Sequence, residues 1–207
     1  MNSKELIEAF YDIAAVIEWE KDYLTELDNV IADGDHGINL DRGFKSVEAK
    51  LPELTGMAPS KIFQTVAMTL LSTVGGAAGP LYGTGFMRMG ASVQNKDEIF
   101  TSDFIDALKA AIDGISARGR SQYGEKTMLD SMIPAYDAMK DAFESGKTDK
   151  EIWNLGIKAA EEGIEFTKTI SASKGRASYI GERSIGHQDP GATSFTLMLK
   201  TVGEKIS

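Results

Sequence analysis

Apolar residues recur three or four positions apart along almost the whole chain, and this helical spacing restricts the possible fold more than any other feature. Stripes of this kind predict helices over residues 3–26, 40–51, 63–71, 81–94, 101–119, 129–146, 148–168 and 189–202. No stretch alternates convincingly with the period of two that marks a half-buried strand. The sequence therefore predicts an all-α fold, a bundle of about eight helices without a sheet.

Residues that favour helix ends give several of these helices an expected boundary. Thr148 and Glu151 have the spacing of a capping box. Gly119 and Gly146 should end helices, and Pro134 should kink the helix that contains it. Side chains expected to cap other helix starts are Ser3, Ser60, Thr101 or Ser102, and Asp189. Residues 171–188 lack periodicity and are rich in charge, Gly and Ser, so we expect a long loop that acts as a lid.

Length and charge limit the class of protein. The 207 residues are expected to form one domain, 1–207, and the net charge of −9 leaves no basic stripe that would hold nucleic acid. The absence of cysteine excludes disulfides, thiolate nucleophiles and zinc clusters. No secretory signal is recognisable, and no apolar run reaches the roughly 18 residues of a membrane span. We expect a cytoplasmic protein without a membrane partner.

Three carboxylates stand within eight residues, as Asp28, Asp33 and Asp35, and Gly34 between the last two indicates a turn. Carboxylates this close repel one another unless a cation neutralises them, and oxygen ligands without thiolates suit magnesium, calcium or manganese. The plain alternative is a solvated turn with helix-capping carboxylates. A calcium loop of the EF-hand type is excluded because Ile38 stands at its sixth position, which requires glycine. We interpret the three aspartates as a metal site.

The helix expected after this turn should begin beside the carboxylates. Its first N–H groups have no partners within the helix, and Gly34 and Gly37 let a ligand approach the backbone, which favours a phosphate. A metal beside a phosphate indicates a nucleotide. The glycine-rich residues 75–79 are either helix punctuation and tight packing or a second backbone surface for phosphate. Residues 146–148 end like a Walker A loop but lack its upstream glycine, since position 141 is Asp.

The string Ala-Asp-Gly-Asp-His-Gly-Ile-Asn-Leu-Asp-Arg-Gly-Phe over residues 32–44 resembles the signature of the nucleotide-binding L subunit of dihydroxyacetone kinase. The resemblance continues, in the same order, through residues 74–86, 124–130 and 174–193. Four long blocks that span most of the chain are far more specific than one short motif. The sequence is therefore identified as a member of this L-subunit family.

The resemblance implies an antiparallel eight-helix barrel with the nucleotide at one open end. It implies that Asp28, Asp33 and Asp35 hold magnesium, as a pair of ions bridging the phosphates of ADP or ATP. The nucleotide contacts that it implies are His36, Gly37, Ile38, Asn39, Ala77, Ala78, Gly119, Met128, Arg176, Asp189, Pro190 and Gly191. Met128 could instead be a core residue and Asp189 only a helix cap. For His187, the other histidine, we expect only a supporting role in positioning the site.

The function implied is that of the ADP- and magnesium-binding subunit of a phosphoenolpyruvate-dependent dihydroxyacetone kinase. Phosphate would pass from a phosphohistidine carrier of the phosphotransferase system, the M subunit, through bound ADP/ATP to dihydroxyacetone on a K subunit. Arg176 is the expected catalytic residue, placed over the terminal phosphate. Since the sequence stops at Ser207 without a second domain, we expect the separate-subunit form rather than the fused ATP-dependent kinase.

Two other functions stay open at this point. The first is a subunit of an ATP-exchanging kinase for another short ketose or polyol. The second is a nucleotide-loaded binding module that reports to a transcriptional regulator without transferring phosphate. A homodimer is an additional open expectation. Because all these proteins would share the nucleotide motifs, their partners rather than this sequence distinguish them.

Overall fold

The computed structural model describes residues 1–206, which form nine α-helices and two short 3-10 helices and no strand beyond one isolated bridge between Asn2 and Glu98. The all-α class predicted from the sequence is confirmed. The elements are α1 (Ser3–Trp19), α2 (Lys21–Ile31), α3 (His36–Glu48), η1 (Leu51–Leu54), α4 (Pro59–Thr73), α5 (Ala78–Ser92), α6 (Thr101–Gly119), α7 (Leu129–Glu144), α8 (Asp149–Thr169), η2 (Arg176–Ser184) and α9 (Pro190–Gly203).

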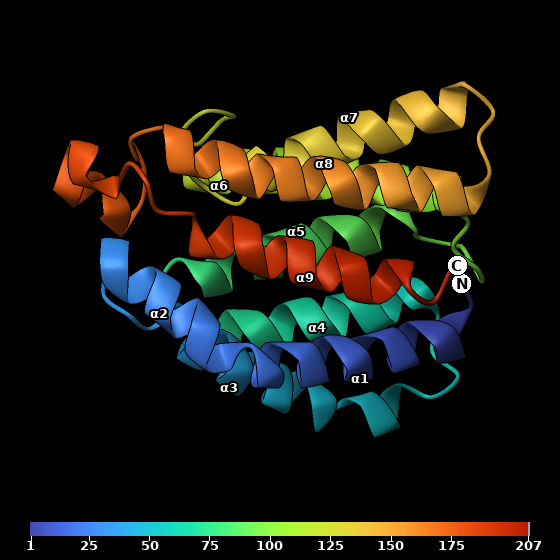
Figure 1. The fold of residues 1–207 in the computed structure, drawn as a ribbon. Helices are drawn as coiled ribbons and strands as arrows, with labels where there is room; N and C mark the ends of the chain where they lie inside the picture. The colour runs from blue at the N-terminus through green and yellow to red at the C-terminus, as the bar shows by residue number, and fades with distance from the viewer. Residues whose placement is uncertain (207) are drawn as a thin grey trace.

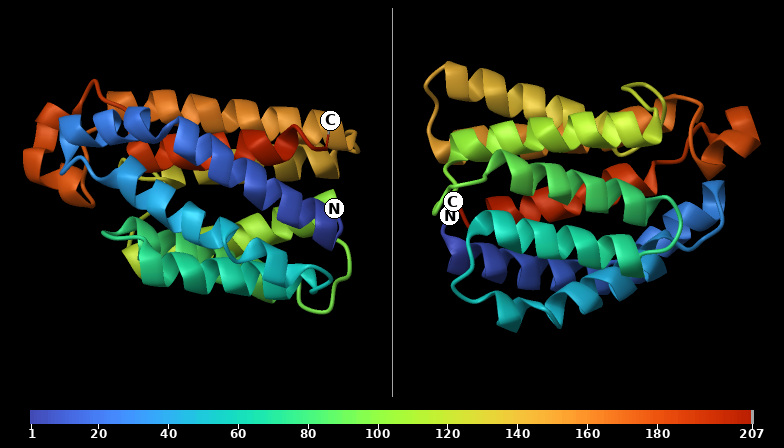
Figure 2. Two further views of the ribbon diagram at one scale, coloured as in Figure 1. Left: turned by 90° about the horizontal axis from the view of Figure 1, so that it is seen from below. Right: turned by 180° about the vertical axis from the view of Figure 1, so that it is seen from behind.

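The long helices lie side by side and alternate in direction along the chain (Figure 1). From α3 onward each α-helix packs against the next, while α1 packs against both α3 and α9, so that the succession of contacts returns to its start. The two termini lie at one end of the bundle, and η2 and the tip of α2 lie at the other (Figures 1 and 2). This succession supports the eight-helix barrel, which itself stays a prediction.

The core is one continuous cluster of apolar side chains to which every α-helix contributes. Within it the rings of Phe10, Phe63 and Phe86 pack on one another, with centroids 5.5 to 6.2 Å apart. These rings border an apolar cavity of about 300 Å³, which we call the central cavity. Among residues 1–206, no helix combines the length and the apolar character that crossing a membrane requires.

The helix expected over residues 3–26 is in fact two helices, so this boundary prediction was wrong. The chain bends at Glu20, and α2 continues to Ile31. The sequence gives no sign of the bend, because the buried residues Ile17, Leu24 and Ile31 stand seven residues apart on both sides of it. As a result Asp28 lies in the last turn of a helix rather than in the turn that follows it.

Three expected N-caps were wrong, each because the preceding residue starts the helix better. The side chain of Asn2, not Ser3, accepts the N–H groups of Lys4 and Glu5. Pro59 occupies the first turn of α4, which places Ser60 inside the helix. Phe100 precedes α6 and donates its N–H to the Asp103 carboxylate, so that Thr101 and Ser102 are helical.

Other boundary predictions are confirmed. Thr148 and Glu151 form the capping box at the start of α8. The carboxylate of Asp189 accepts the Ala192 N–H at the start of α9. Gly119 is the last residue of α6, although the left-handed residue that ends this helix is Arg120, with φ of 49°. Pro134 lies inside α7, and the kink expected there stays a prediction.

Residues 171–188, which we call the lid segment, are not irregular throughout, as the sequence had suggested. Arg176–Ser184 form η2, two 3-10 turns joined at Gly181, where φ is 56°. The turns are held because Ala172, Ala177 and Ile180 pack against Ile31 at the end of α2. The lid segment is therefore anchored on α2 by a small apolar cluster of its own.

Candidate functional site

A cavity of about 380 Å³, which we call the end cavity, lies under the lid segment at the end of the bundle. Its wall is formed by the turn between α2 and α3, the start of α5, the end of α6, the loop before α7, the start of η2 and the start of α9. Helix starts and loops rather than helix faces thus make up most of the wall. The volume lies within the range of about 300–1,000 Å³ that is common for small-ligand sites.

Asp28, Asp33 and Asp35 come together on one side of the end cavity. One carboxylate oxygen of each lies within 4.8 Å of those of the other two. Asp28 is buried, and its Oδ2 accepts the N–H groups of Asp35 (2.8 Å) and His36 (3.2 Å), which fixes the turn around it. Burial raises the pKa of Asp28, against these two hydrogen bonds, and the charges of Asp33 and Asp35 raise it further.

This donor set fits a hard divalent cation. All three groups are carboxylates, which magnesium and calcium prefer, and a cation would relieve the mutual repulsion of three acids at a half-buried place. Backbone hydrogen bonds from Asp35 and His36 also keep the Asp28 carboxylate and the turn itself in place. The residues present therefore suit magnesium, and their role as its ligands stays a prediction.

Arg176 reaches this cluster from the lid segment. Its Nε lies 3.0 Å from Oδ2 of Asp33, while the side chain remains 63% exposed. Nearby, Lys174 forms an ion pair with Glu125 at 3.8 Å, so the lid segment brings two cations to the rim of the end cavity. The expected catalytic arginine is thus placed beside the expected metal ligands.

Three helices begin around the end cavity, at His36 (α3), Ala78 (α5) and Pro190 (α9). The first N–H groups of a helix have no partners within it and form a positive region suited to phosphate. Here the Asp28 carboxylate already accepts the His36 N–H and the Asp189 carboxylate accepts the Ala192 N–H, so the other N–H groups of these helix starts are the ones that would meet a phosphate. The backbone before α5 comes close to the carboxylates, because a β-carbon on Gly76 would lie 3.9 Å from Oδ1 of Asp35. Gly76 also has φ of 64°, a conformation that glycine adopts without strain.

The glycine run at residues 75–79 has two parts, and the structure confirms tight packing for one of them. Gly75, Gly76, Ala77 and Ala78 line the end cavity, as expected for a backbone surface that holds phosphate. Gly79 instead faces the core side, where a β-carbon would lie 2.3 Å from the Val74 carbonyl oxygen. The run is therefore a stretch of cavity wall followed by one packing glycine, and its contact with phosphate stays a prediction.

The His36 side chain connects two of the helix starts. Its Nε2 lies 2.9 Å from Oγ of Ser194, whose hydroxyl is 2.7 Å from the hydroxyl of Tyr82. Desolvation lowers the pKa of His36 to about 4, against the charge of Asp35 and a hydrogen bond with the Pro190 backbone. A neutral imidazole tied to α9 fixes the relative position of the α3 and α9 starts, and its contact with a nucleotide stays a prediction.

Most of the other expected contact residues also lie on the wall of the end cavity, namely Asn39, Gly119, Met128, Asp189, Pro190 and Gly191. Two do not. A β-carbon on Gly37 would lie 2.0 Å from the Lys21 carbonyl oxygen, so this glycine permits the packing of α3 on α2. Ile38 is 50% exposed and points away from the wall.

Two buried charged residues of the site were missed by sequence reasoning. Lys126 lines the end cavity and is buried, and Asp130 accepts the N–H groups of Gly124 and Thr127. Both belong to residues 124–130, a block that carried the family resemblance and in which only Met128 was assigned a role. Asp189 is also buried, which raises its pKa to about 7. The burial of these charges is a tertiary property that residue spacing does not reveal.

The fold and the end cavity together define an all-α protein that gathers three carboxylates and three helix starts at one site, as a metal- and phosphate-binding protein requires. The DAK2 domain family model matches residues 30–204. The chain therefore belongs to the DAK2 domain family, and within it to the L-subunit family expected from the sequence.

Relatives with assigned activities show the same. The chain is 40% identical to the Escherichia coli K12 protein named PEP-dependent dihydroxyacetone kinase, ADP-binding subunit DhaL, over 89% of this chain and 88% of that protein. It is 40% identical to the PTS-dependent dihydroxyacetone kinase, ADP-binding subunit DhaL of Lactococcus lactis, over 92% and 91% of the two chains.

A solved structure supports the fold. The dihydroxyacetone kinase of C. freundii in complex with AMP-PNP and Mg²⁺ superposes with a TM-score of 0.76 at 20% identity. The match covers 99% of this chain but only 34% of that one. This chain thus has the fold of about one third of that kinase.

Proposed function

We propose that this protein is the ADP- and magnesium-binding subunit of a phosphoenolpyruvate-dependent dihydroxyacetone kinase. The observation that carries the proposal is the meeting of Asp28, Asp33 and Asp35 with the starts of α3, α5 and α9 at one cavity. The names of the relatives at 40% identity specify the phosphate donor system and the ketone for those proteins. Their match extends over nearly the full length of this chain.

Different residues of the end cavity would bind different parts of a nucleoside diphosphate. The three carboxylates would hold magnesium, for which we propose two ions, and the bound metal supplies positive charge against the phosphate oxygens. The N–H groups at the helix starts bind the same oxygens from the other side. Met128 and Gly119, which also line the end cavity, are the proposed contacts of the base.

Phosphoryl transfer needs positioning and charge stabilisation more than covalent chemistry by the protein. Arg176 is the residue of this chain best placed for that task, because its guanidinium stands beside Asp33 at the rim. We propose that it stabilises the transferring phosphoryl group while a K subunit presents the ketone. A phosphohistidine carrier subunit would then restore the nucleotide in place.

Several finer points belong to the same proposal. One core cluster joins all nine α-helices of residues 1–206, which supports a single domain over 1–207. Homodimerisation and docking to a transcriptional regulator are proposals that rest on the family resemblance. A cytoplasmic location stays a prediction of the sequence.

The test is a coupled assay with separately purified K and M subunits. Phosphoenolpyruvate with its phosphate carriers should drive formation of dihydroxyacetone phosphate, and ATP without the M subunit should not. Arg176→Ala should lower turnover by about 10²-fold or more, as for the loss of one donor to a developing charge, with a smaller effect on ADP binding. Arg183→Ala, an exposed arginine of the lid segment off the cavity wall, is the control.

The outcomes separate the rival functions. Turnover with ATP alone would replace the proposal by an ATP-exchanging kinase subunit. Binding of ADP without turnover in the presence of both partner subunits would favour the binding module. An equal loss of turnover in the Arg176→Ala and Arg183→Ala variants would show that Arg176 has no specific role in phosphoryl transfer.

A further inference from the structure

Lys126 is a buried lysine whose ammonium bonds only backbone carbonyl groups. Its side chain is 1% exposed, and its Nζ donates to the carbonyl oxygens of Thr167 at 2.5 Å, Ile170 at 3.3 Å, and His187. An ammonium has three protons to donate, so all three are used. Within residues 1–206 no carboxylate forms an ion pair with it, although Asp189 and Asp130 are close enough to raise its pKa against the lowering by burial.

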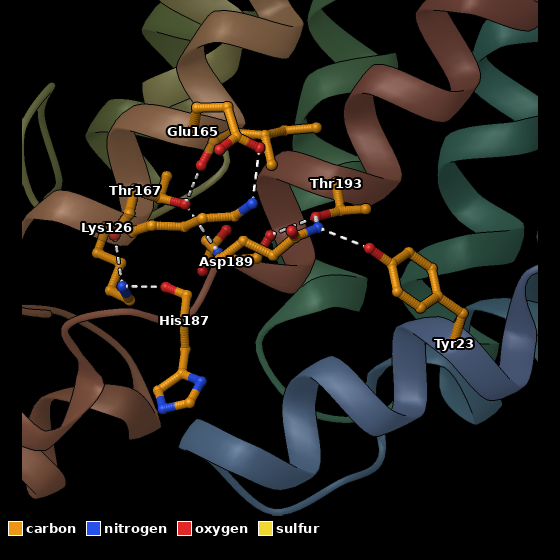
Figure 3. A network of polar contacts seen from close by, with 10 residues as sticks. Tyr23, Lys126, Glu165, Thr167, His187, Asp189 and Thr193 are labelled. Atoms are coloured by element: carbon orange, nitrogen blue, oxygen red, sulfur yellow. Dashed lines mark hydrogen bonds and ion pairs between the residues drawn. The ribbon is translucent and has the colours of Figure 1, made fainter.

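These carbonyl groups belong to the two ends of the lid segment. Thr167 and Ile170 lie at the end of α8, just before the segment, where carbonyl groups have no partners within the helix. His187 lies at the other end, two residues before Asp189 caps α9. Figure 3 shows the Lys126 side chain between Thr167, near the end of α8, and His187, just before α9. We call the place where these two chain segments meet the junction. One ammonium thus holds together the entry and the exit of the lid segment.

Neighbouring contacts converge on the same junction. The Asp189 N–H donates to the Thr167 hydroxyl at 3.0 Å, and the Gly186 N–H donates to the Lys168 carbonyl at 2.7 Å. Gln188 donates to the Tyr23 hydroxyl and so connects the junction to α2 (Figure 3). Lys126 is the charged centre of this network.

The backbone of Lys126 is also unusual. Its φ is 60°, in the left-handed region that residues other than glycine rarely adopt. The Asp130 carboxylate imposes this conformation, because it accepts the N–H groups of Gly124 and Thr127 on either side. Such conformations persist where the surrounding structure determines them and are concentrated at functional sites. The loop holds its lysine in a strained backbone so that the side chain points into the junction.

We propose that Lys126 is a positioning residue, which ties both ends of the lid segment to the cavity wall and thereby sets the place of Arg176 over the carboxylates. The same loop carries Met128 and holds the start of the lid segment, since the Ser173 N–H donates to the Glu125 carbonyl. Removing the ammonium leaves the buried carbonyl group of Thr167 and the partly buried hydrogen bonds of Ile170 and His187 without their donor, and it frees both ends of the segment at once. The effect of Lys126 on phosphoryl transfer through Arg176 rests on the proposed function, whereas the anchoring of the lid segment by Lys126 does not.

The test compares Lys126→Met, which keeps the length and apolar stem, with Lys126→Arg, which keeps the charge and donors. Lys140→Met, on the exposed surface of α7, is the matched control. In the nucleotide-free proteins, hydrogen exchange of residues 171–188 should become about tenfold faster in Lys126→Met while exchange in α4 and α5 is unchanged. Lys126→Arg should recover much of this protection.

A double-variant cycle tests whether Lys126 acts through Arg176. In the coupled assay Lys126→Met should lower kcat by roughly 10- to 100-fold, as is typical for residues that orient a ligand-binding group. The variant combining Lys126→Met with Arg176→Ala should be no slower than Arg176→Ala alone, because residues that act as a unit are not additive. Additive losses, or faster exchange throughout the bundle, would overturn the proposal in favour of a general structural role.

A measurement on the unaltered protein covers the case in which Lys126→Met does not fold. A lysine ammonium with all protons hydrogen-bonded exchanges slowly and gives its own ¹⁵N–¹H signal, which should be present in the wild type and absent in Lys126→Arg. Absence of this signal from the wild type would contradict the claim that the Lys126 ammonium anchors both ends of the lid segment. Failure of the wild type to bind ADP with magnesium would overturn the proposed function alone, since the exchange results do not depend on nucleotide.

Discussion

The central cavity and the end cavity are similar in volume, about 300 and about 380 Å³, but they are bounded by different kinds of structure. Apolar faces of helices form most of the wall of the first, with the rings of Phe10, Phe63 and Phe86 among them, and residues at the chain ends and in the loop before α6 complete it. Starts of helices, glycines and buried acids surround the second. The first shape follows from side-chain packing, whereas the second depends on where each helix begins. The bundle therefore keeps its apolar packing and its proposed ligand site in separate regions.

Changing one carboxylate of the end cavity is expected to have the largest effect. Asp33→Asn or Asp35→Asn preserves the shape of the side chain but removes a charge from the proposed metal site. The loss of affinity for ADP with magnesium should resemble the breaking of a buried ion pair, about 3–5 kcal/mol. Calorimetric titration measures it, with Asp113→Asn on the surface of α6 as control. Unchanged affinity in both aspartate variants would mean that the end cavity is not the site.

Ligand should stabilise the protein through the end cavity alone. A nucleotide that binds only the folded state adds about 2.7 kcal/mol at a concentration one hundred times its dissociation constant. Adding a chelator to the loaded protein should therefore lower its Tm, and the Asp33→Asn variant should show no such change. Thermal melts with ADP, with and without chelator, provide the measurement. A Tm indifferent to both additions would contradict the account.

The buried acid at the start of α9 should make stability depend on pH. Burial raises the pKa of Asp189 to about 7 from its ordinary 3.8, so between these values the folded state holds a proton that the unfolded state has lost. Its contribution to stability is present at low pH and is lost as pH rises through this window, by at most about 1.4 kcal/mol per pH unit.

The control for this pH effect is Asp189→Asn, which keeps an oxygen for the Ala192 N–H. His36 has the opposite trend, because its pKa is lowered, but it acts equally in both proteins. The stability of the wild type relative to Asp189→Asn, from urea unfolding of the nucleotide-free proteins, should therefore fall from pH 5 to pH 7. A difference independent of pH would show that Asp189 is not desolvated.

A change in the central cavity should have the smallest effect and should alter stability only. Phe63→Leu keeps an apolar side chain but loses the ring contacts with Phe10 and Phe86, which should cost about 1 kcal/mol of unfolding free energy. Affinity for ADP with magnesium should not change. Urea unfolding and calorimetric titration of the same sample check both statements. A matching loss of affinity would show that the two cavities are coupled.

The same comparison explains how much the sequence could predict. Helical spacing identifies the apolar faces that surround the central cavity, and it predicted the all-α class. The caps at Thr148 and Asp189, whose side chains accept the hydrogen bonds, were predicted, whereas the equivalent cap Asn2 was missed in favour of its neighbour Ser3. The bend at Glu20 was missed because the apolar stripe passes through it without a shift.

At the end cavity the motifs predicted most of the residues that line the wall, but they did not predict where each of them would lie. The three aspartates and the backbone at Ala77 and Ala78 are together on one wall, whereas Gly37 turned out to pack on α2. Lys126 could not have been found, because its partners are carbonyl groups, which every residue possesses. The periodicity also left η2 undetected, since its apolar anchor is only a few residues.

The most direct test of the account locates the metal. Crystals of the protein grown with ADP and Mn²⁺, which replaces magnesium and scatters anomalously, should show an anomalous peak among Asp28, Asp33 and Asp35, with the phosphates of ADP against the starts of α3, α5 and α9. A peak at this place would confirm that the end cavity is the metal and nucleotide site. Ordered ADP elsewhere, or Mn²⁺ bound away from these three carboxylates, would contradict it.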